Sequence, residues 1–320
     1  MSAETSIFLL TAVAPTKREG SSPTRLVGRH LARQLLDFGV KVRVLAEFGQ
    51  SEGWPPGAEV IHGSVVNSHD AAMAFVGVSR VFLAGADLSS VNEVVEAAAA
   101  EGVERIVVLS SHGPEYEVKF PPETWYWLAI EKAVEASGIA WTHIRPSAVM
   151  GACLEGSYPA TGSDWPLSIR REGVVREPLL NTGYYPFIHE ADLAAVAATA
   201  LLQDGYTGQI LEAVGLPIST RSRVAAIEDA IGHKIAAHEI TLDEGREIWR
   251  RQGWPNGGIQ VTLYGLKAYA HQLTELTEWT LEQEPSVEAL IGRRPLTFEQ
   301  WAREHIDAFM PNWNEPRNGS

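Results

Sequence analysis

The chain has one cysteine, Cys153, among its 320 residues, so no disulfide can form within it. Such a chain suits a reducing compartment. No apolar run approaches the roughly 18 residues of a membrane span, and residues 7–13 are too short, and lack the basic flank, for a signal sequence. Acidic residues outnumber basic ones, 40 to 26. This excess argues against binding to nucleic acid or to anionic membranes. These absences predict a soluble, cytoplasmic protein.

Two kinds of periodicity alternate along the first half of the chain. Continuous apolar runs rich in β-branched residues suit buried strands, and apolar residues spaced three or four positions apart suit helices. The predicted strands cover residues 6–10, 40–45, 58–63, 80–85, 105–110 and 140–145, and the predicted helices cover residues 26–36, 68–75, 89–101 and 124–137. The alternation predicts an α/β fold, a Rossmann-type doubly wound parallel sheet with helices on both faces.

The pattern loosens after Pro146. Residues 151–186 are rich in Gly, Pro, Trp and Tyr and predict long loops with a short strand pair, whereas a helix at 191–202 and a strand at 209–214 return to the first pattern. The stretch after that is mostly helical. We expect a dinucleotide-binding domain at 1–150 that residues 187–214 rejoin, a smaller, mostly helical substrate-binding or lid domain from 151–186 and 215–312, and a polar tail at 313–320.

The turn after the first strand departs most from the expected pattern. A Rossmann unit joins strand to helix by a glycine-rich turn of about seven residues, whose backbone N–H groups reach the pyrophosphate. Here the turn runs from Thr11 to Arg25, and only Gly28, which lets the helix pack closely, stands where a glycine is expected. Our hypothesis is that Lys17, Arg18 and Arg25 pair directly with phosphate. The alternative is a solvated loop on a protein that no longer binds a dinucleotide.

Several short segments resemble the NmrA-like branch of the atypical short-chain dehydrogenases/reductases. They occur in the family's order, at residues 26–31, 105–111, 131–138, 142–146, 187–194 and 294–302. As a set they are fairly specific for the fold and much less so for the substrate. The resemblance implies an NAD or NADP cofactor across the carboxyl ends of the strands and a C-terminal domain over the substrate. It also suggests ketoreductases that tailor aromatic polyketides in secondary metabolism.

The resemblance also assigns cofactor contacts. Ala12 takes the place of the opening glycine, sixteen positions before Gly28. Ser64 replaces an aspartate with which relatives often hold adenine. Ala84 and Gly85, after the fourth strand, fit a close backbone approach to the adenosine half.

The second strand ends at Glu47, where NADP-preferring relatives often carry arginine. A carboxylate there can accept hydrogen bonds from ribose hydroxyls and repels a 2′-phosphate, which favours NAD. Arg43 and the loop cations could instead serve a 2′-phosphate, and Glu47 could be a plain surface residue. The preference between NAD and NADP stays open.

The superfamily's Tyr-x-x-x-Lys pair is absent from its usual helix. Counting back from Glu131, the lysine position falls on Trp127 and the tyrosine position on Glu123. Tyr126 and Lys132 are six residues apart, about 240° of helical rotation, so they cannot share one face. Some NmrA-like ketoreductases are thought to lack the pair, with hydride delivery and substrate geometry carrying most of the catalysis.

Candidate proton donors follow the fifth strand, where the superfamily places its carbonyl-binding serine. Ser110 and Ser111 could donate to a developing alkoxide, and His112 could relay or supply the proton. Tyr126 is a further candidate. The structural alternatives are that the serines cap the strand end, that His112 is a loop residue, and that Tyr126 packs.

Other positions are assigned to the cofactor, to the substrate or to neither. The segment with Arg145 and Pro146 should pass beside the nicotinamide, with its backbone rather than its side chains taking part. Aromatic residues in segments facing the nicotinamide suit a flat apolar ligand, although many of them must be core. These candidate substrate contacts are Trp125, Trp127, Tyr158, Trp165, Tyr185 and Phe187. The histidines show no metal-ligand spacing, so no metal is predicted.

Taken together, the sequence predicts a reductase that uses NADH or NADPH to reduce a carbonyl on a bulky, aromatic or polycyclic metabolite. A protein that senses the nucleotide without turnover is the main alternative, favoured by the missing Tyr/Lys pair. A cofactor-assisted isomerase or cyclase on the same fold is a third.

Overall fold

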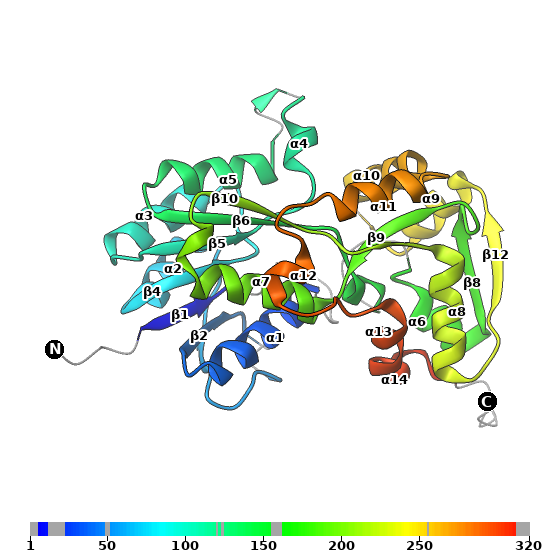
Figure 1. The fold of residues 1–320 in the computed structure, drawn as a ribbon, viewed down its shortest axis with the longest axis horizontal. Helices are drawn as coiled ribbons and strands as arrows, with labels where there is room; N and C mark the ends of the chain where they lie inside the picture. The colour runs from blue at the N-terminus through cyan, green and yellow to red at the C-terminus, as the bar shows by residue number, and fades with distance from the viewer. Residues whose placement is uncertain are drawn as a thin grey trace.

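The computed structural model describes residues 6–11, 23–48, 52–119, 121–122, 125–154, 162–254 and 256–311. Its first lobe is built on a seven-stranded sheet in the order β10-β6-β5-β4-β1-β2-β3, with every pairing parallel (Figure 1). The strands are β1 (Ile7–Leu10), β2 (Lys41–Ala46), β3 (Glu59–His62), β4 (Val78–Leu83), β5 (Arg105–Leu109), β6 (Ala140–Pro146) and β10 (Gln209–Ala213). The Rossmann-type fold predicted from the sequence is confirmed.

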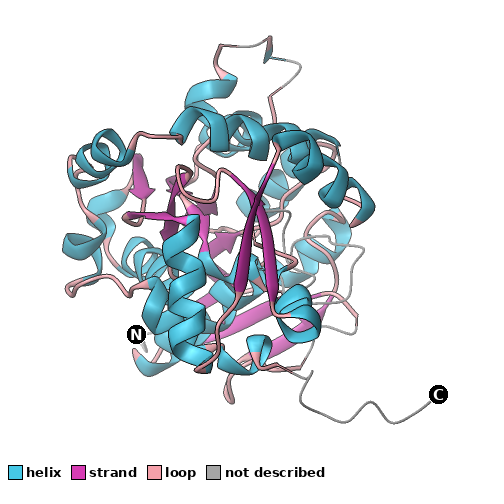
Figure 2. Ribbon diagram, turned by 90° about the vertical axis from the view of Figure 1, so that its right-hand side faces the viewer, coloured by secondary structure: helices cyan, strands magenta, loops and turns pink. Residues whose placement is uncertain are grey.

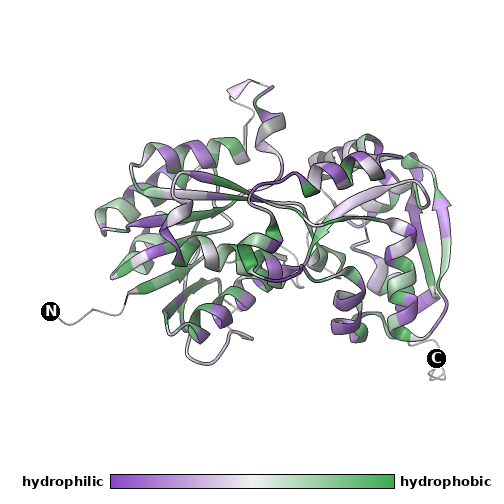
Figure 3. Ribbon diagram, viewed as in Figure 1, coloured by the Kyte–Doolittle hydropathy of each residue, from purple (hydrophilic) through white to green (hydrophobic). Residues whose placement is uncertain are grey.

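Helices cover both faces of this sheet. They are α1 (Pro23–Asp37), α2 (Ser68–Phe75), α3 (Val91–Ala100), α5 (Trp127–Ala136) and α7 (Glu190–Leu202), with the short α4 (Pro114–Glu117) and η3 (Asp204–Tyr206) at connections. One apolar layer joins α1 and α7 to the sheet through residues such as Leu10, Leu31 and Val196. The opposite layer, with Leu9, Val94 and Val134 among its members, lies under α2, α3 and α5. Burial on both faces explains why the inner strands are largely apolar runs, which Figure 3 shows as mostly green arrows.

The chain reverses direction across the sheet between β1 and β4. From β1 it proceeds outward to β2 and β3, and from β4 it proceeds the other way to β5, β6 and β10. Ligands of open α/β sheets bind at the carboxyl ends of the strands beside such a switch point. The functional site is therefore expected where β1, β4, β5 and β6 end.

The second lobe lies beyond this edge of the sheet (Figures 1 and 2). It contains one three-stranded sheet in the order β11-β9-β7 and one strand pair, β12-β8. Its elements are β7 (Ala148–Val149), η2 (Met150–Cys153), α6 (Trp165–Glu172), β8 (Val174–Pro178), β9 (Tyr184–Ile188), β11 (Pro217–Ser219), α8 (Thr220–Ile231), β12 (Ala236–Ile240), α9 (Leu242–Arg251), α10 (Asn256–Tyr269), α11 (Leu273–Leu281), α13 (Phe298–Glu304) and α14 (Ile306–Phe309), whereas α12 (Val287–Ile291) packs back on α7. In the part of the chain described, no helix is long and apolar enough to cross a membrane.

Two features of the second lobe differ from the sequence expectation. Residues 162–186, expected as loops with a strand pair, also contain helix α6, whose apolar face is little more than Trp165 and Ile169. The stretch expected to be helical contains β12, whose parallel partner β8 lies about sixty residues earlier in the chain. Both elements are stabilised by distant partners, so a local pattern did not reveal them.

Candidate functional site

The carboxyl ends of β1 and β4 are joined by a side chain. Thr11, directly after β1, is buried, and its Oγ1 lies 2.9 Å from both the N–H and the carbonyl oxygen of Ala84. Gly85 follows with φ +75°, a backbone conformation that favours glycine. The two residues predicted to permit a close backbone approach therefore lie at the switch point, and one of them has the backbone that needs a glycine.

Glu47 and Ser64 meet at the ends of β2 and β3. The Ser64 hydroxyl lies 3.1 Å from Oε1 of Glu47, and its backbone N–H donates to Asp70 at 3.0 Å. Arg43 is bound elsewhere: it pairs with Glu59 at 2.9 Å and donates to the carbonyls of residues 74 and 76. A carboxylate held at the end of β2 is the acceptor that ribose hydroxyls need, so these residues fit the adenosine half of a dinucleotide.

The remaining predicted cofactor contacts are in or before α1. Gly28 is buried within the helix and Arg25 lies in its first turn. Ala12, Lys17 and Arg18 lie outside the described residues, so the charge-pairing hypothesis for the phosphate turn stays a prediction.

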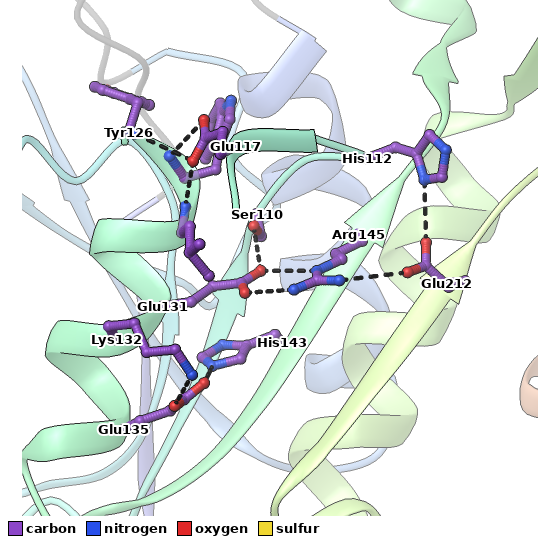
Figure 4. A network of polar contacts seen from close by, with 12 residues as sticks. Ser110, His112, Glu117, Tyr126, Glu131, Lys132, Glu135, His143, Arg145 and Glu212 are labelled. Carbon is purple, nitrogen blue, oxygen red and sulfur yellow. Dashed lines mark hydrogen bonds and ion pairs between the residues drawn. The ribbon is translucent and has the colours of Figure 1, made fainter. Parts of the chain in front are cut away.

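Ser110, at the end of β5, is held by a buried ion pair (Figure 4). Its hydroxyl lies 2.6 Å from Oε1 of Glu131 on α5, a side chain that is 1% exposed. Arg145 on β6 binds the same carboxylate in a bidentate manner, Nε at 3.0 Å and Nη2 at 2.7 Å. Ser110 thus donates its proton to Glu131 in this structure, and its donation to a substrate oxygen stays a prediction. The side chain of Arg145, which we expected to be secondary to its backbone, is central.

His112 lies two residues further on, at the boundary between the lobes. Its Nδ1 is 3.3 Å from Oε2 of Glu212 on β10, and its ring centroid is 4.8 Å from that of Trp279 on α11 (Figure 4). The second oxygen of Glu212 lies 3.8 Å from Nη1 of Arg145. One guanidinium therefore connects the carboxylate that holds Ser110 to the carboxylate that holds His112, and Ser111 lies between the two in sequence.

Tyr126 lies close to the end of β4. Its hydroxyl donates to the carbonyl of Ala86 at 3.2 Å, and its ring packs edge-on against Trp127. Glu117 accepts hydrogen bonds from the backbone N–H groups of residues 126, 127 and 128, and so caps the start of α5 (Figure 4). The Tyr126 hydroxyl proton is therefore donated to a backbone carbonyl in this structure.

The other residues near the usual Tyr-x-x-x-Lys helix have structural contacts. Trp127 packs against the apolar layer under α5. Lys132 pairs with Glu135 at 2.6 Å, and Glu135 lies 3.4 Å from the buried His143. Burial lowers the pKa of His143, which favours its neutral form.

Two of the predicted substrate contacts are almost fully buried. Trp165 is 0% exposed and Phe187 is 2% exposed, and both belong to the core of the second lobe. Their rings lie on the guanidinium of Arg223, each 4.6 Å from its centre. Aromatic residues at these positions fill the core instead of lining an open surface.

The remaining aromatic candidates are only partly buried. Trp125, Trp127 and Tyr185 keep some exposure, and Tyr158 lies outside the described residues. Tyr185 packs edge-on against Tyr269 and lies so close to Gly265 that a Cβ there would be 3.1 Å from its ring. Among the described residues, no group of three or more His, Cys, Asp or Glu side chains is arranged to hold a metal ion.

The comparisons with known proteins agree with this fold. Residues 24–176 match the NAD(P)H-binding family model. The chain is 30% identical over 294 residues to (4-alkanoyl-5-oxo-2,5-dihydrofuran-3-yl)methyl phosphate reductase of Streptomyces griseus subsp. griseus, covering 90% of this chain and 97% of that one. It is 25% identical over 307 residues to the NAD(P)H azoreductase of Xenophilus azovorans, covering 94% and 99%. The triphenylmethane reductase of Citrobacter sp. superposes with a TM-score of 0.68 at 19% identity, covering 94% of this chain and 99% of that chain.

The chain belongs to the NAD(P)H-binding family, and it is an NAD(P)H-dependent oxidoreductase. The cofactor class predicted from the sequence is confirmed.

Sequence reasoning missed three side chains of the site. Glu131 served only to count positions, and Glu212 and Trp279 were not considered. For Glu131 a signal existed: it occupies a buried position of α5 among Leu128, Ile130 and Val134. A carboxylate on an apolar helix face needs a charged or hydrogen-bonding partner.

Proposed function

We propose that the protein reduces a carbonyl group on a bulky, aromatic or polycyclic metabolite, with His112 donating the proton. The observation that carries this proposal is the contact of His112 with Glu212 at the carboxyl edge of the sheet, beside Trp279 of the second lobe. The bound dihydronicotinamide would supply the hydride.

The residues of this chain would supply orientation and the proton. Glu212 accepts from Nδ1 of His112 and fixes the ring, so that Nε2 presents its proton to the oxygen of the substrate. Ser111 is a second hydroxyl donor to the same oxygen. Glu47 and Ser64 would hold the adenosine ribose, and Gly85 would let the backbone approach the nucleotide.

The aromatic character of the substrate rests on the side chains around this edge. Trp279 lies against His112, and Tyr185 and Tyr269 form a partly buried pair on β9 and α10. Such rings favour a flat apolar ligand. The two named relatives are reductases of an alkanoyl-oxo-dihydrofuranyl methyl phosphate and of azo compounds, which supports an unsaturated acceptor.

The test follows nicotinamide absorbance with NADH and NADPH against a panel of aromatic ketones and quinones. We expect turnover of a ketone, and a loss of about 100-fold in kcat for His112→Gln, the size typical of a lost general acid. His69→Gln, on the exposed side of α2, is the matched control and should retain full activity. Ketone turnover that survives His112→Gln unchanged would remove His112 from the mechanism.

A further inference from the structure

Arg145 contacts both carboxylates of the site. It holds Glu131 through two short hydrogen bonds and reaches Glu212 at 3.8 Å. Ser110 is hydrogen-bonded to Glu131, and His112 is hydrogen-bonded to Glu212. The contacts form one continuous network that runs from α5 through β6 to β10.

The three charged side chains of this network, Glu131, Arg145 and Glu212, are largely withdrawn from solvent. In such surroundings of low dielectric, their mutual contacts are stronger than they would be in water.

We propose that Arg145 and Glu212 are positioning residues for proton donation by His112. Arg145 anchors Glu212 from the rigid strand β6, and Glu212 in turn holds the imidazole in the orientation that presents Nε2. The inference rests on the proposed ketone reductase, since it concerns the proton that this reaction needs.

The chemistry offers a readout that a merely structural role would not change. Hydride addition to a ketone carbon breaks the C=O π bond and leaves an alkoxide, a strong base that needs the proton from His112 as it forms; solvent then returns a proton to the histidine. Hydride addition to a quinone leaves an aromatic hydroquinone anion, whose charge is delocalised and which needs far less help. Loss of proton delivery therefore slows ketone turnover much more than quinone turnover.

The experiment measures kcat and KM for one aromatic ketone and one quinone in four proteins. Glu212→Gln keeps an acceptor for Nδ1 but removes the charge, and Arg145→Lys keeps the charge but cannot bind Glu131 in a bidentate manner and also reach Glu212. The matched control is Arg105→Lys. Arg105 is a buried arginine of the neighbouring strand, bound to the carbonyls of residues 200 and 203 and to Asp204 at the opposite end of the sheet.

We expect Glu212→Gln to lower kcat for the ketone by about 10- to 100-fold and kcat for the quinone by less than about threefold, with KM for the nucleotide unchanged. Arg145→Lys should show the same split to a smaller degree. Arg105→Lys should lose stability without changing the ratio of the two rates.

Equal losses on both acceptors in Glu212→Gln, with native thermal unfolding, would overturn the inference and leave the reductase proposal standing. A wild-type protein that binds the nucleotide but turns over neither acceptor would overturn both. Glu212 is more exposed than Arg145, so its substitution reports on the inference even if Arg145→Lys fails to fold.

Discussion

The burial of Glu177 makes the stability of the protein depend on pH in a direction that can be worked out. This carboxyl group on β8 is 1% exposed and accepts a hydrogen bond from the backbone N–H of Gly162 at 2.7 Å. Burial and, to a lesser extent, the charge of Asp164 raise its pKa to about 8, with Arg223 opposing both. Glu177 is therefore protonated in the folded protein at neutral pH.

The sign and size of the effect follow from linkage. In the unfolded chain the pKa of Glu177 returns to its ordinary value of 4.5, so the folded value is the raised one. The native state then holds a proton that the unfolded state has lost, and stability falls as pH rises from about 4.5 to about 8. Each pH unit in this window lowers the free energy of unfolding by ~1.4 kcal/mol, so the largest possible loss is about 5 kcal/mol.

Glu177→Gln removes this titration and keeps an oxygen for Gly162. Urea unfolding between pH 5 and pH 9 should show a stability that falls less steeply with pH in the variant, so that the two curves cross and the variant is the more stable at pH 9. A residual slope is expected because burial also raises the pKa of Asp164.

The control for this experiment is Glu172→Gln, an exposed carboxylate of α6 paired with Arg176, which should follow the wild-type slope. A Glu177→Gln curve parallel to wild type would refute the assignment of a raised pKa to this group.

Three further predictions rest on other parts of the structure. Cys153 is fully buried and burial raises its pKa to about 11, so a thiol reagent at pH 8 should label the native protein at least ~100-fold more slowly than the protein in urea; equal rates would contradict this. Glu47→Ala should raise the affinity for NADPH relative to NADH by about tenfold, because it removes a ribose acceptor that repels a 2′-phosphate; nucleotide competition measures the ratio, and an unchanged ratio places Glu47 outside the site. Glu117→Ala should cost about 1–2 kcal/mol in urea unfolding, since it leaves the N–H groups at the start of α5 without their cap, and a loss too small to measure would show that solvent replaces it.

The first lobe could be predicted because its elements are specified locally. Strands buried on both faces appear as unbroken apolar runs. Helix α2 has the bounds predicted from its apolar spacing, and in the structure Asn67 caps it through the N–H groups of residues 69 and 70. In the second lobe the elements depend on partners far along the chain. The strand β12 has little strand character of its own and exists because it pairs with β8.

The residues of the site likewise differ in whether a local sequence pattern identifies them. Ser110 and His112 could be found because polar residues that follow a strand must lie at the carboxyl edge of a parallel sheet. Glu131 and Glu212 could not be assigned to the site from the sequence, because each is recognised only through a hydrogen-bond partner that is distant in the chain. Glu212 lies 100 residues from His112, and Glu131 lies 21 residues from Ser110. A sequence shows which side chains could donate a proton, whereas their partners decide which proton is still available. Here the partners of Ser110 and Tyr126 accept their hydroxyl protons, and the proposed donor, His112, contacts Glu212, which Arg145 contacts in turn.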